Sequence, residues 1–404
     1  MLTRSDRALR RDLVAANRTV RAARSPLPTG TNVVLRRFET RAGNPRRPGQ
    51  MYQFWFRTRG CTFDRAGQCS MCNYGTGPEI DPERLLRAVR WRLVQVPQGS
   101  FVYLSPSGSL LDPREVEPGL RAGLLALVAE RRPASFAFES RPELCTPAAL
   151  EEVRAALPAD TTVVCEIGVE SWDPDVRMLC HLKPSTQESY LAAVAAARRA
   201  GMELIANITL GGLGLSPAEA RRDTVTSVSG TRRAGFITPM VFPLSAKSGT
   251  LLGWAHDRGL WDPPTLWMLV RVLFECALQG EAEGRPPDLD ISWFNPAPDD
   301  VIRSRPDGCS SCRQVLLDTL VAFRLDPLSD RLSDALEWRG CDCPQRTAEL
   351  LAGPIGPGHP EGSGYRDRLA AVAAEWARAG AVPDAAVKDR DQASADTRSG
   401  SALR

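Results

Sequence analysis

Histidine and lysine are scarce in this sequence, and long apolar runs are absent from it. The 404 residues include three histidines, and lysine occurs only at positions 183, 247 and 388, so nearly all basic residues are arginine. No stretch approaches the roughly 18 uninterrupted apolar residues of a membrane span, and the first twenty residues lack the apolar segment of a secretory signal. We therefore expect a cytoplasmic protein with no membrane partner.

The three histidines are poor candidates for catalysis. His181 precedes the segment "LKPST", His256 lies in a segment with a helical pattern, and His359 lies among glycines and prolines. Each context is typical of a surface or capping position rather than of a general base. No catalytic residue is assigned from the sequence.

The first 50 residues carry a strong charge asymmetry. They hold twelve arginines against Asp6, Asp12 and Glu39. A basic segment of this kind can bind a polyanion such as RNA, but it can equally be a solvated helix in an arginine-rich protein. Both interpretations stay open, and the lack of interleaved aromatic residues, which stack on bases in RNA-binding segments, favours the helix.

Beyond residue 50, β-rich apolar runs alternate with helical patterns. Parallel strands need a crossover connection, usually a helix, so this alternation predicts an α/β fold with a parallel sheet. Periodicity alone does not decide whether that sheet closes into a barrel or lies open. The expected strands are residues 51–58, 100–106, 134–140, 161–171, 202–210 and 236–244, and the expected helices between them are residues 81–96, 114–131, 147–157, 187–201 and 216–228.

In either arrangement, ligands gather at the carboxyl ends of the parallel strands. A distinctive motif follows each of the first five strands, so strand order alone predicts one common active face. These motifs are "CTFDRAGQCSMC" (61–72), "SPSGSLLD" (105–112), "ESRPE" (139–143), "GVES" (168–171) and "TLGGLG" (209–214).

The first of these motifs holds three cysteines, with seven and then two residues between them. A Cys-x-x-Cys turn lets two thiolates converge on one metal centre, and the longer loop brings in the third. A closed zinc site would need a fourth ligand, but Asn73 and Tyr74 follow, and the first histidine is His181. Three thiolates instead suit a 4Fe-4S cluster with one iron left open to substrate or cofactor.

These motifs resemble a known family, the radical S-adenosylmethionine (SAM) superfamily. The segment "RTRGCTFDRAGQCSMCNYG" is similar to the cluster loop of the archaeosine-synthase radical SAM subunit and of the related elongator catalytic subunit, and "ESRPEL", "EIGVES" and "LKPST" fit the same pattern over about residues 30 to 350. The first spacing of seven departs from the three residues common in the superfamily. The resemblance implies a partial (β/α)6 TIM-type barrel, with SAM on the open iron of a 4Fe-4S cluster that Cys61, Cys69 and Cys72 ligate.

By the same resemblance, residues at the strand ends bind SAM. Met71 would turn its backbone towards the adenine. Ser107, Gly108 and Ser109 stand where the superfamily has a glycine-rich segment that binds the methionine amino group, although the acidic residue often found there is missing. Each remaining candidate for the methionine carboxylate or the ribose hydroxyls could instead be a helix cap or ion-pair partner, and these candidates are Glu139, Arg141, Glu170 and Ser171.

A second cysteine group comprises Cys309, Cys312, Cys341 and Cys343. Four thiolates can close a tetrahedral zinc site without another ligand, which makes a structural zinc ion the first hypothesis. An auxiliary iron-sulfur cluster is the rival, because four thiolates satisfy it equally. The remaining cysteines lie in apolar contexts and are expected to be small buried hydrophobic residues, namely Cys145, Cys165, Cys180 and Cys276.

The sequence therefore predicts four parts. They are an arginine-rich arm (1–49), the partial barrel (50–300), a C-terminal cysteine-metal module (301–352), and a short helix with a disordered tail (353–404).

The resemblance implies a radical SAM enzyme that cleaves SAM with an electron from a donor such as flavodoxin or ferredoxin and abstracts a substrate hydrogen atom. A small-molecule substrate in natural-product or cofactor biosynthesis is the first hypothesis, since no separate nucleic-acid domain is visible. One alternative is tRNA modification, by C-N cleavage of an amino-acid adduct of 7-deazaguanine. An alternative from another class is a non-catalytic zinc protein that binds RNA through its arginine-rich arm.

Overall fold

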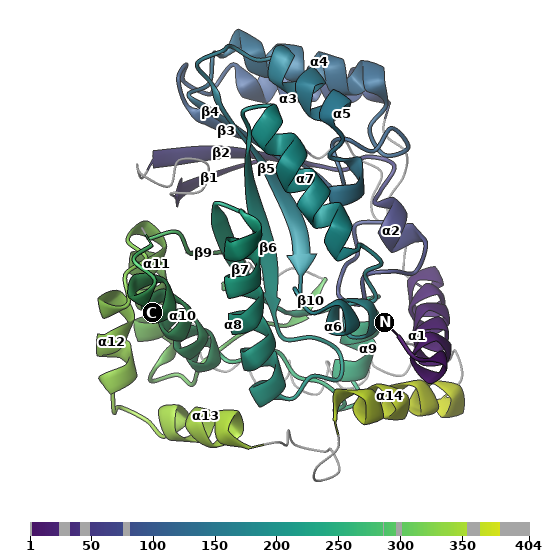
Figure 1. Ribbon diagram of the computed structural model, residues 1–404, viewed down its shortest axis with the longest axis vertical. Helices are drawn as coiled ribbons and strands as arrows, with labels where there is room; N and C mark the ends of the chain where they lie inside the picture. The colour runs from purple at the N-terminus through teal and green to yellow at the C-terminus, as the bar shows by residue number, and fades with distance from the viewer. Residues whose placement is uncertain are drawn as a thin grey trace, which may run out of the picture.

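One curled sheet of eight strands forms the centre of the described part of the molecule (Figure 1). The structure is a computed structural model, and it describes residues 2–23, 33–40, 49–75, 81–285, 287–295, 301–353 and 364–379. β1 is antiparallel to β2, and all the other neighbouring strands are parallel. In sheet order the strands are β1 (Val34–Thr40), β2 (Gly49–Phe56), β3 (Phe101–Pro106), β4 (Ser135–Ser140), β5 (Thr162–Glu170), β6 (Glu203–Leu210), β7 (Thr238–Pro243) and β9 (Asp290–Ile291).

The predicted α/β class and partial barrel are confirmed, and the six predicted strands are β2 to β7. The two edge strands were not predicted. β1 has the sequence "VLRRFET", whose paired arginines interrupt the apolar alternation on which strand prediction depends. β9 has only two residues, which is too short to leave a periodic pattern. Both strands therefore depend on pairing with a neighbour.

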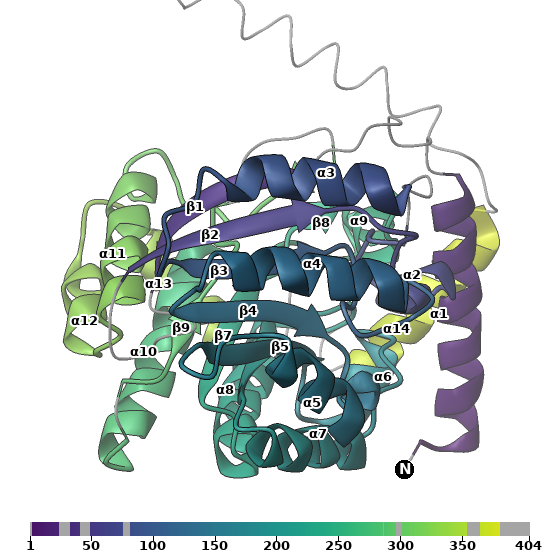
Figure 2. The same ribbon diagram turned by 90° about the horizontal axis from the view of Figure 1, so that it is seen from above.

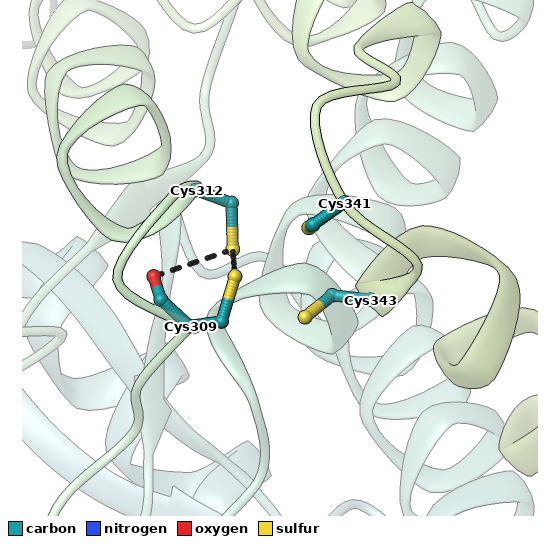
Figure 3. Close-up of side chains that lie close together, drawn as sticks. All are labelled: Cys309, Cys312, Cys341 and Cys343. Carbon is teal, nitrogen blue, oxygen red and sulfur yellow. Dashed lines mark hydrogen bonds between the residues drawn. The ribbon is translucent and has the colours of Figure 1, made fainter.

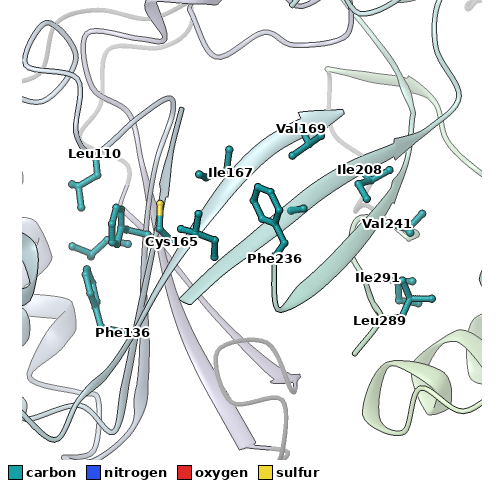
Figure 4. Packing of buried hydrophobic residues seen from close by; sticks show 14 of the residues in the cluster. Leu110, Phe136, Cys165, Ile167, Val169, Ile208, Phe236, Val241, Leu289 and Ile291 are labelled. Atoms are coloured by element: carbon teal, nitrogen blue, oxygen red, sulfur yellow. The ribbon is translucent and has the colours of Figure 1, made fainter. Parts of the chain in front are cut away.

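Helices cover the outer face of the sheet (Figure 2). Alternate strand residues such as Phe54, Phe138 and Ile208 point outwards and are fully buried against these helices in one large core, part of which Figure 4 shows. The α3 helix begins with Asp81 as its N-cap and Pro82 at its first position, within the range expected from the sequence. The crossover helices are α3 (Pro82–Leu93), α4 (Pro118–Glu130), α5 (Pro147–Ala155), α7 (Gln187–Arg199) and α8 (Pro217–Ala234), with the shorter α2 (Thr62–Arg65), η1 (Pro142–Leu144) and α6 (Pro174–Leu179) in the connections.

The concave face of the sheet carries the other half of the strand residues, in two tiers. Near the amino ends of the strands, apolar side chains form a small cluster of their own. One step towards the carboxyl ends, the inward residues become polar, and they include Glu139, Glu166 and Asn207. The apolar tier is Met51, Tyr103, Ala137, Val164, Ile205 and Met240.

The C-terminal region begins with a two-stranded ribbon and continues as helices that pack beside β9 and α8 (Figure 1). The apolar helix of this region is α10, which contacts α8, α11, α12 and α13. The elements are β8 (Ala246–Lys247), β10 (Ile302–Ser304), α9 (Leu251–His256), α10 (Leu266–Ala282), α11 (Arg313–Leu325), α12 (Asp330–Glu337) and α13 (Cys343–Ala352).

The two terminal helices, α1 (Arg4–Ala22) and α14 (Tyr365–Ala379), lie side by side (Figure 1). α1 is the first part of the arginine-rich segment, and Leu13 and Asn17 on it are fully buried, so this part is a packed helix rather than a free or merely solvated arm. The short helix expected after residue 353 is α14. Much of the expected disordered tail lies outside the described residues, and no helix among those described is long and apolar enough to cross a membrane.

Candidate functional site

Residues 61–72, which we call the sulfur loop, follow β2 at the carboxyl edge of the sheet. The Cys61 N–H donates to the Tyr74 carbonyl at 3.1 Å, and the Cys72 N–H donates to the Cys69 carbonyl at 3.1 Å. Cys69 has a φ of 64°, in the left-handed region that costs energy for a residue other than glycine. The loop is thus a tight turn that holds three cysteines on one connection.

The three sulfurs of the loop lie in a largely buried setting with positive charges around them. Burial raises the pKa of Cys61 to about 11, and it also raises the pKa of Cys69 and of Cys72. Neighbouring cations act in the opposite direction and favour the thiolates: Arg141 on Cys61, Lys183 on Cys69, and Lys247 on Cys72. Two of the three lysines in the chain therefore stand beside these sulfurs.

A metal centre fits this donor set, because metals bind the thiolate form that the surrounding cations favour. In the part of the chain that the structure describes, only the second cysteine group brings three or more candidate metal ligands together. Its ligand atoms lie within 4.8 Å of one another. The sulfur loop does not form such a group, which is compatible with a multi-iron cluster that keeps its thiolates further apart than one zinc ion does.

The N-terminal helix α1 braces the sulfur loop. Asn17 donates to the Gly67 carbonyl at 2.9 Å, and its own side-chain oxygen accepts from the Leu251 N–H at 3.1 Å. Arg21 donates to the carbonyls of Gln68 and Cys72, both at 3.1 Å, and pairs with Asp64 on α2. The arginine-rich segment thus supports the candidate metal site. The sequence had left two interpretations open, an RNA-binding arm and a solvated helix, and had favoured the helix.

The far side of the sulfur loop docks on the segment that follows α6. The Ser70 N–H donates to the His181 carbonyl at 3.0 Å, and the Ser70 hydroxyl donates to the Cys180 carbonyl at 2.8 Å. Met71 is buried, at 8% exposure, in the apolar cluster beneath. The prediction that His181 lies at the surface or in a cap is wrong, because its side chain is fully buried and its Nε2 lies 3.3 Å from the Thr209 hydroxyl.

The segment Ser107–Ser109 after β3 is bonded to a buried acid. Gly108 has a φ of 143°, and a Cβ there would collide with the Glu115 carboxylate. The Ser109 N–H donates to Glu115 Oε2 at 2.6 Å, and the Thr62 N–H at the start of α2 donates to Glu115 Oε1 at 2.6 Å. Glu115 therefore provides the acidic group of this segment, although it lies a few residues further along the chain. Its sequence context, "REVE" (114–117), did not indicate this role.

Arg141, after β4, lies against the sulfur loop. Its guanidinium donates to Glu115 at 2.7 Å and also bonds Asp112, and it stacks over the Phe63 ring at 4.6 Å. Arg141 Nη1 lies 3.5 Å from Cys61 Sγ. The two acids hold the arginine in a fixed orientation beside the first cysteine, and sequence reasoning identified neither of them.

Glu139, on β4 itself, points onto the concave face. The Tyr103 hydroxyl lies 2.7 Å from Glu139 Oε1 and 2.8 Å from Glu166 Oε2, and the Ser105 hydroxyl donates to Glu139 at 2.8 Å. Burial raises the pKa of Glu139 to about 7, and burial together with the Glu139 charge raises that of Glu166 to about 8. Tyr103 and Glu166 were missed because a strand pattern does not tell which face an isolated polar residue occupies.

Glu170 and Ser171 lie at the end of β5. Glu170 has a φ of 65° and pairs with Lys183 at 3.0 Å. The Ser171 hydroxyl donates to Asp223 at 2.6 Å, and burial raises the pKa of Asp223 to about 7. The candidate SAM-binding residues thus gather along one edge of the sheet, although several have protein partners there.

The second cysteine group is assembled by the C-terminal helices (Figure 3). The four sulfur atoms lie within 4.8 Å of one another, and those of Cys309 and Cys312 are 3.6 Å apart. The Trp267 indole on α10 donates to Cys312 Sγ at 3.2 Å. A Cβ on Gly308 would meet that sulfur at 2.8 Å, so glycine is needed there for space. The four thiolates converge as a single tetrahedral metal ion requires.

Four other cysteines, predicted to be small buried hydrophobic residues, are all buried, as expected. They are Cys145, Cys165, Cys180 and Cys276.

Residues 55–223, from β2 to α8, match the family described as the radical SAM superfamily. Archaeosine synthase subunit beta of Methanosarcina acetivorans is 26% identical over 306 residues, which cover 73% of this chain and 83% of that protein. An uncharacterized protein of Methanocaldococcus jannaschii is 26% identical over 237 residues, so the match covers 56% of this chain and 64% of that relative.

Two solved structures superpose on parts of this chain. Elp3 of Methanocaldococcus infernus superposes with a TM-score of 0.45 at 18% identity, over 61% of this chain and 60% of that one. Methylornithine synthase superposes with a TM-score of 0.42 at 15% identity, over 87% of this chain and 93% of that one.

Proposed function

We propose that this chain, whose residues 55–223 match the radical SAM superfamily, is a radical SAM enzyme in which Cys61, Cys69 and Cys72 ligate the 4Fe-4S cluster on which SAM is cleaved. The observation that carries the proposal is the sulfur loop itself: three cysteines on one tight connection, with Lys183, Lys247 and Arg141 beside them. The family implies this cluster and SAM as cofactors.

When bound, the cluster supplies one electron that splits SAM into methionine and a 5′-deoxyadenosyl radical, which takes a hydrogen atom from the substrate. We propose that residues at the sheet edge hold the methionine and ribose parts of SAM: the backbone of Met71 and of Ser107–Ser109, and the side chains of Glu139, Arg141, Glu170 and Ser171. Arg141 supports this assignment best, because two acids hold its guanidinium rigidly beside Cys61.

For the second cysteine group we propose one structural zinc ion rather than an auxiliary cluster. The support is the convergence of four sulfurs within 4.8 Å, since a zinc ion binds each thiolate at about 2.3 Å and thereby draws all four together. The ion would tie residues 309–312 to residues 341–343 and so close the C-terminal module, for which we keep the predicted boundaries 301–352.

The substrate that we propose first is a small molecule in natural-product or cofactor biosynthesis, with flavodoxin or ferredoxin as electron donor in the cytoplasm. Side chains of the arginine-rich helix α1 bind carbonyls of the sulfur loop. The structure therefore supports an RNA-binding arm less than the charge of this segment did. tRNA modification is the second candidate, favoured by the similarity to archaeosine synthase subunit beta over 73% of this chain.

The proposal is tested by anaerobic reconstitution with iron and sulfide, followed by assay of 5′-deoxyadenosine released from SAM in the presence of a strong reductant. We expect a brown protein that releases 5′-deoxyadenosine, and Cys69→Ala should reduce the release to background. Cys145→Ala is the matched control, since Cys145 is also buried but packs beside Cys165. A colourless protein with zinc alone would favour the non-catalytic zinc protein, and undiminished release by Cys69→Ala would refute the cluster assignment.

A further inference from the structure

Five aromatic and cationic side chains contact one another across the concave side of the sheet, and we call them the aromatic-cation group. The rings of Trp55 and Tyr74 are 6.5 Å apart, and Lys247 Nζ lies 5.9 Å from the Tyr74 ring and 5.5 Å from the Trp293 ring. The Arg36 guanidinium lies 5.6 Å from the Trp293 ring. The contacts form a continuous chain between the two edges of the sheet, because Arg36 is on β1 and Trp293 follows β9.

The group stands beside the proposed cluster. The Tyr74 carbonyl accepts a hydrogen bond from the Cys61 N–H, and the charge of Lys247 acts on Cys72. Glu139 is near enough for its charge to act on Tyr74. Substrate must reach this place, since a short-lived radical formed at the cluster has to meet the substrate directly.

The side chains of the group are half-buried, and they are not packed as a core. Within the described residues, neither Arg36 nor Lys247 forms a salt bridge with a carboxylate. Trp293 has a φ of 57°, a conformation that a bulky residue adopts only when its surroundings hold it. Half-exposed rings flanked by two cations that have no carboxylate partner in the described part of the chain are the elements that bind flat anionic ligands, by stacking and by charge.

We propose that the aromatic-cation group is the substrate-recognition site and that it takes a planar heteroaromatic ring bearing an anionic group, as in a nucleotide. The inference rests on the proposed function. Trp55, Tyr74 and Trp293 stack on the ring, and Arg36 and Lys247 bind the anion. The same chemistry occurs in a free nucleotide and in a nucleotide within RNA, and the experiment separates the two sources.

The test is a titration of tryptophan fluorescence in the reconstituted full-length enzyme with GMP, with guanosine and with an unmodified tRNA transcript. We expect saturable quenching by GMP and binding to guanosine that is about tenfold weaker or less, because the phosphate is missing. Trp293→Leu and Lys247→Gln should each weaken GMP binding by about tenfold. Quenching by the transcript at much lower concentration than by GMP would identify the RNA source of this ligand, and the reverse order would identify the free nucleotide.

A matched control comes from the outer surface. Trp91 is 62% exposed on α3 and stacks with Arg92 at 4.9 Å, so Trp91→Leu removes the same kind of pair away from the concave face and should leave GMP binding unchanged. Lys247→Gln provides an independent test of the site in case Trp293→Leu does not fold. The proposal is overturned if neither GMP nor the transcript quenches saturably, or if both substitutions bind GMP like the wild type. Release of 5′-deoxyadenosine by the wild-type enzyme, measured separately, decides whether the proposed function itself has failed.

Discussion

At the scale of single residues, two buried carboxyl groups share one phenolic proton. The Tyr103 hydroxyl lies within hydrogen-bond distance of both Glu139 and Glu166, but it can donate to only one of them at a time. Burial raises the pKa of Glu139 from 4.5 to about 7, and the pKa of Glu166 from 4.5 to about 8. Between about pH 4.5 and about pH 8, the folded protein therefore binds more protons than the unfolded chain does. The pair thus makes the free energy of unfolding fall as the pH rises through this range.

The consequence is measurable by thermal unfolding at about pH 6 and about pH 8.5. We expect a lower melting temperature at the higher pH, and a smaller difference in the double variant Glu139→Gln, Glu166→Gln, which keeps the shape and removes the titration. Some dependence should remain, because burial also raises the pKa of Asp223 to about 7. An equally steep dependence in the double variant would show that the pair does not hold the extra protons.

At the scale of elements, α1 has a task that its composition did not reveal. Arg21 is 8% exposed and Asp64 fully buried at the side chain, and Arg21 also holds two carbonyls of the sulfur loop. Removing one partner of a buried ion pair leaves the other charge uncompensated, which typically costs about 3 kcal/mol or more. Arg21→Ala should therefore lower the free energy of unfolding by about 3 kcal/mol and reduce the iron bound after reconstitution.

Urea unfolding and iron content per chain check this expectation. Arg11→Ala is the control, because Arg11 is on the same helix but 76% exposed, and it should leave both quantities within error. Arg21→Lys should recover part of the iron, since it keeps the charge but not the forked donor geometry. Full iron loading in Arg21→Ala would mean that the sulfur loop holds its shape without α1.

At the scale of the whole molecule, the two cysteine groups are separate centres. The sulfur loop lies at the carboxyl edge of β2, whereas the second group is held by α10, α11 and α13 through contacts such as Trp267 to Cys312. Cys69→Ala should therefore lose its iron and keep about one zinc per chain, and Cys312→Ala should lose zinc and several kcal/mol of stability. Elemental analysis and thermal unfolding measure both. Loss of zinc in Cys69→Ala would show that the centres are coupled.

Part of the fold and of the site could be predicted because the signals are local. Strands β2 to β7 and their helices follow from apolar periodicity, which depends on neighbours in sequence, and the edge motifs follow from strand order. The sulfur loop and the second cysteine group were predictable because cysteine is chemically specific. Which partners hold Arg141, whether His181 is exposed, and which face Glu166 occupies depend on residues far away in sequence, and no local pattern carries that information.

The sequence by itself determined the alternation of strands and helices, the two cysteine groups, and the edge of the sheet at which the sulfur loop and the other strand-end motifs meet, because each depends on spacing along the chain. Only the tertiary structure decided that an arginine-rich helix braces the sulfur loop, that the four C-terminal sulfurs converge within 4.8 Å, and that Arg36 reaches Trp293 across the curled sheet. The physical reason is that charge pairing, metal geometry and ring contacts act through space, between residues that only the packing of the core brings together.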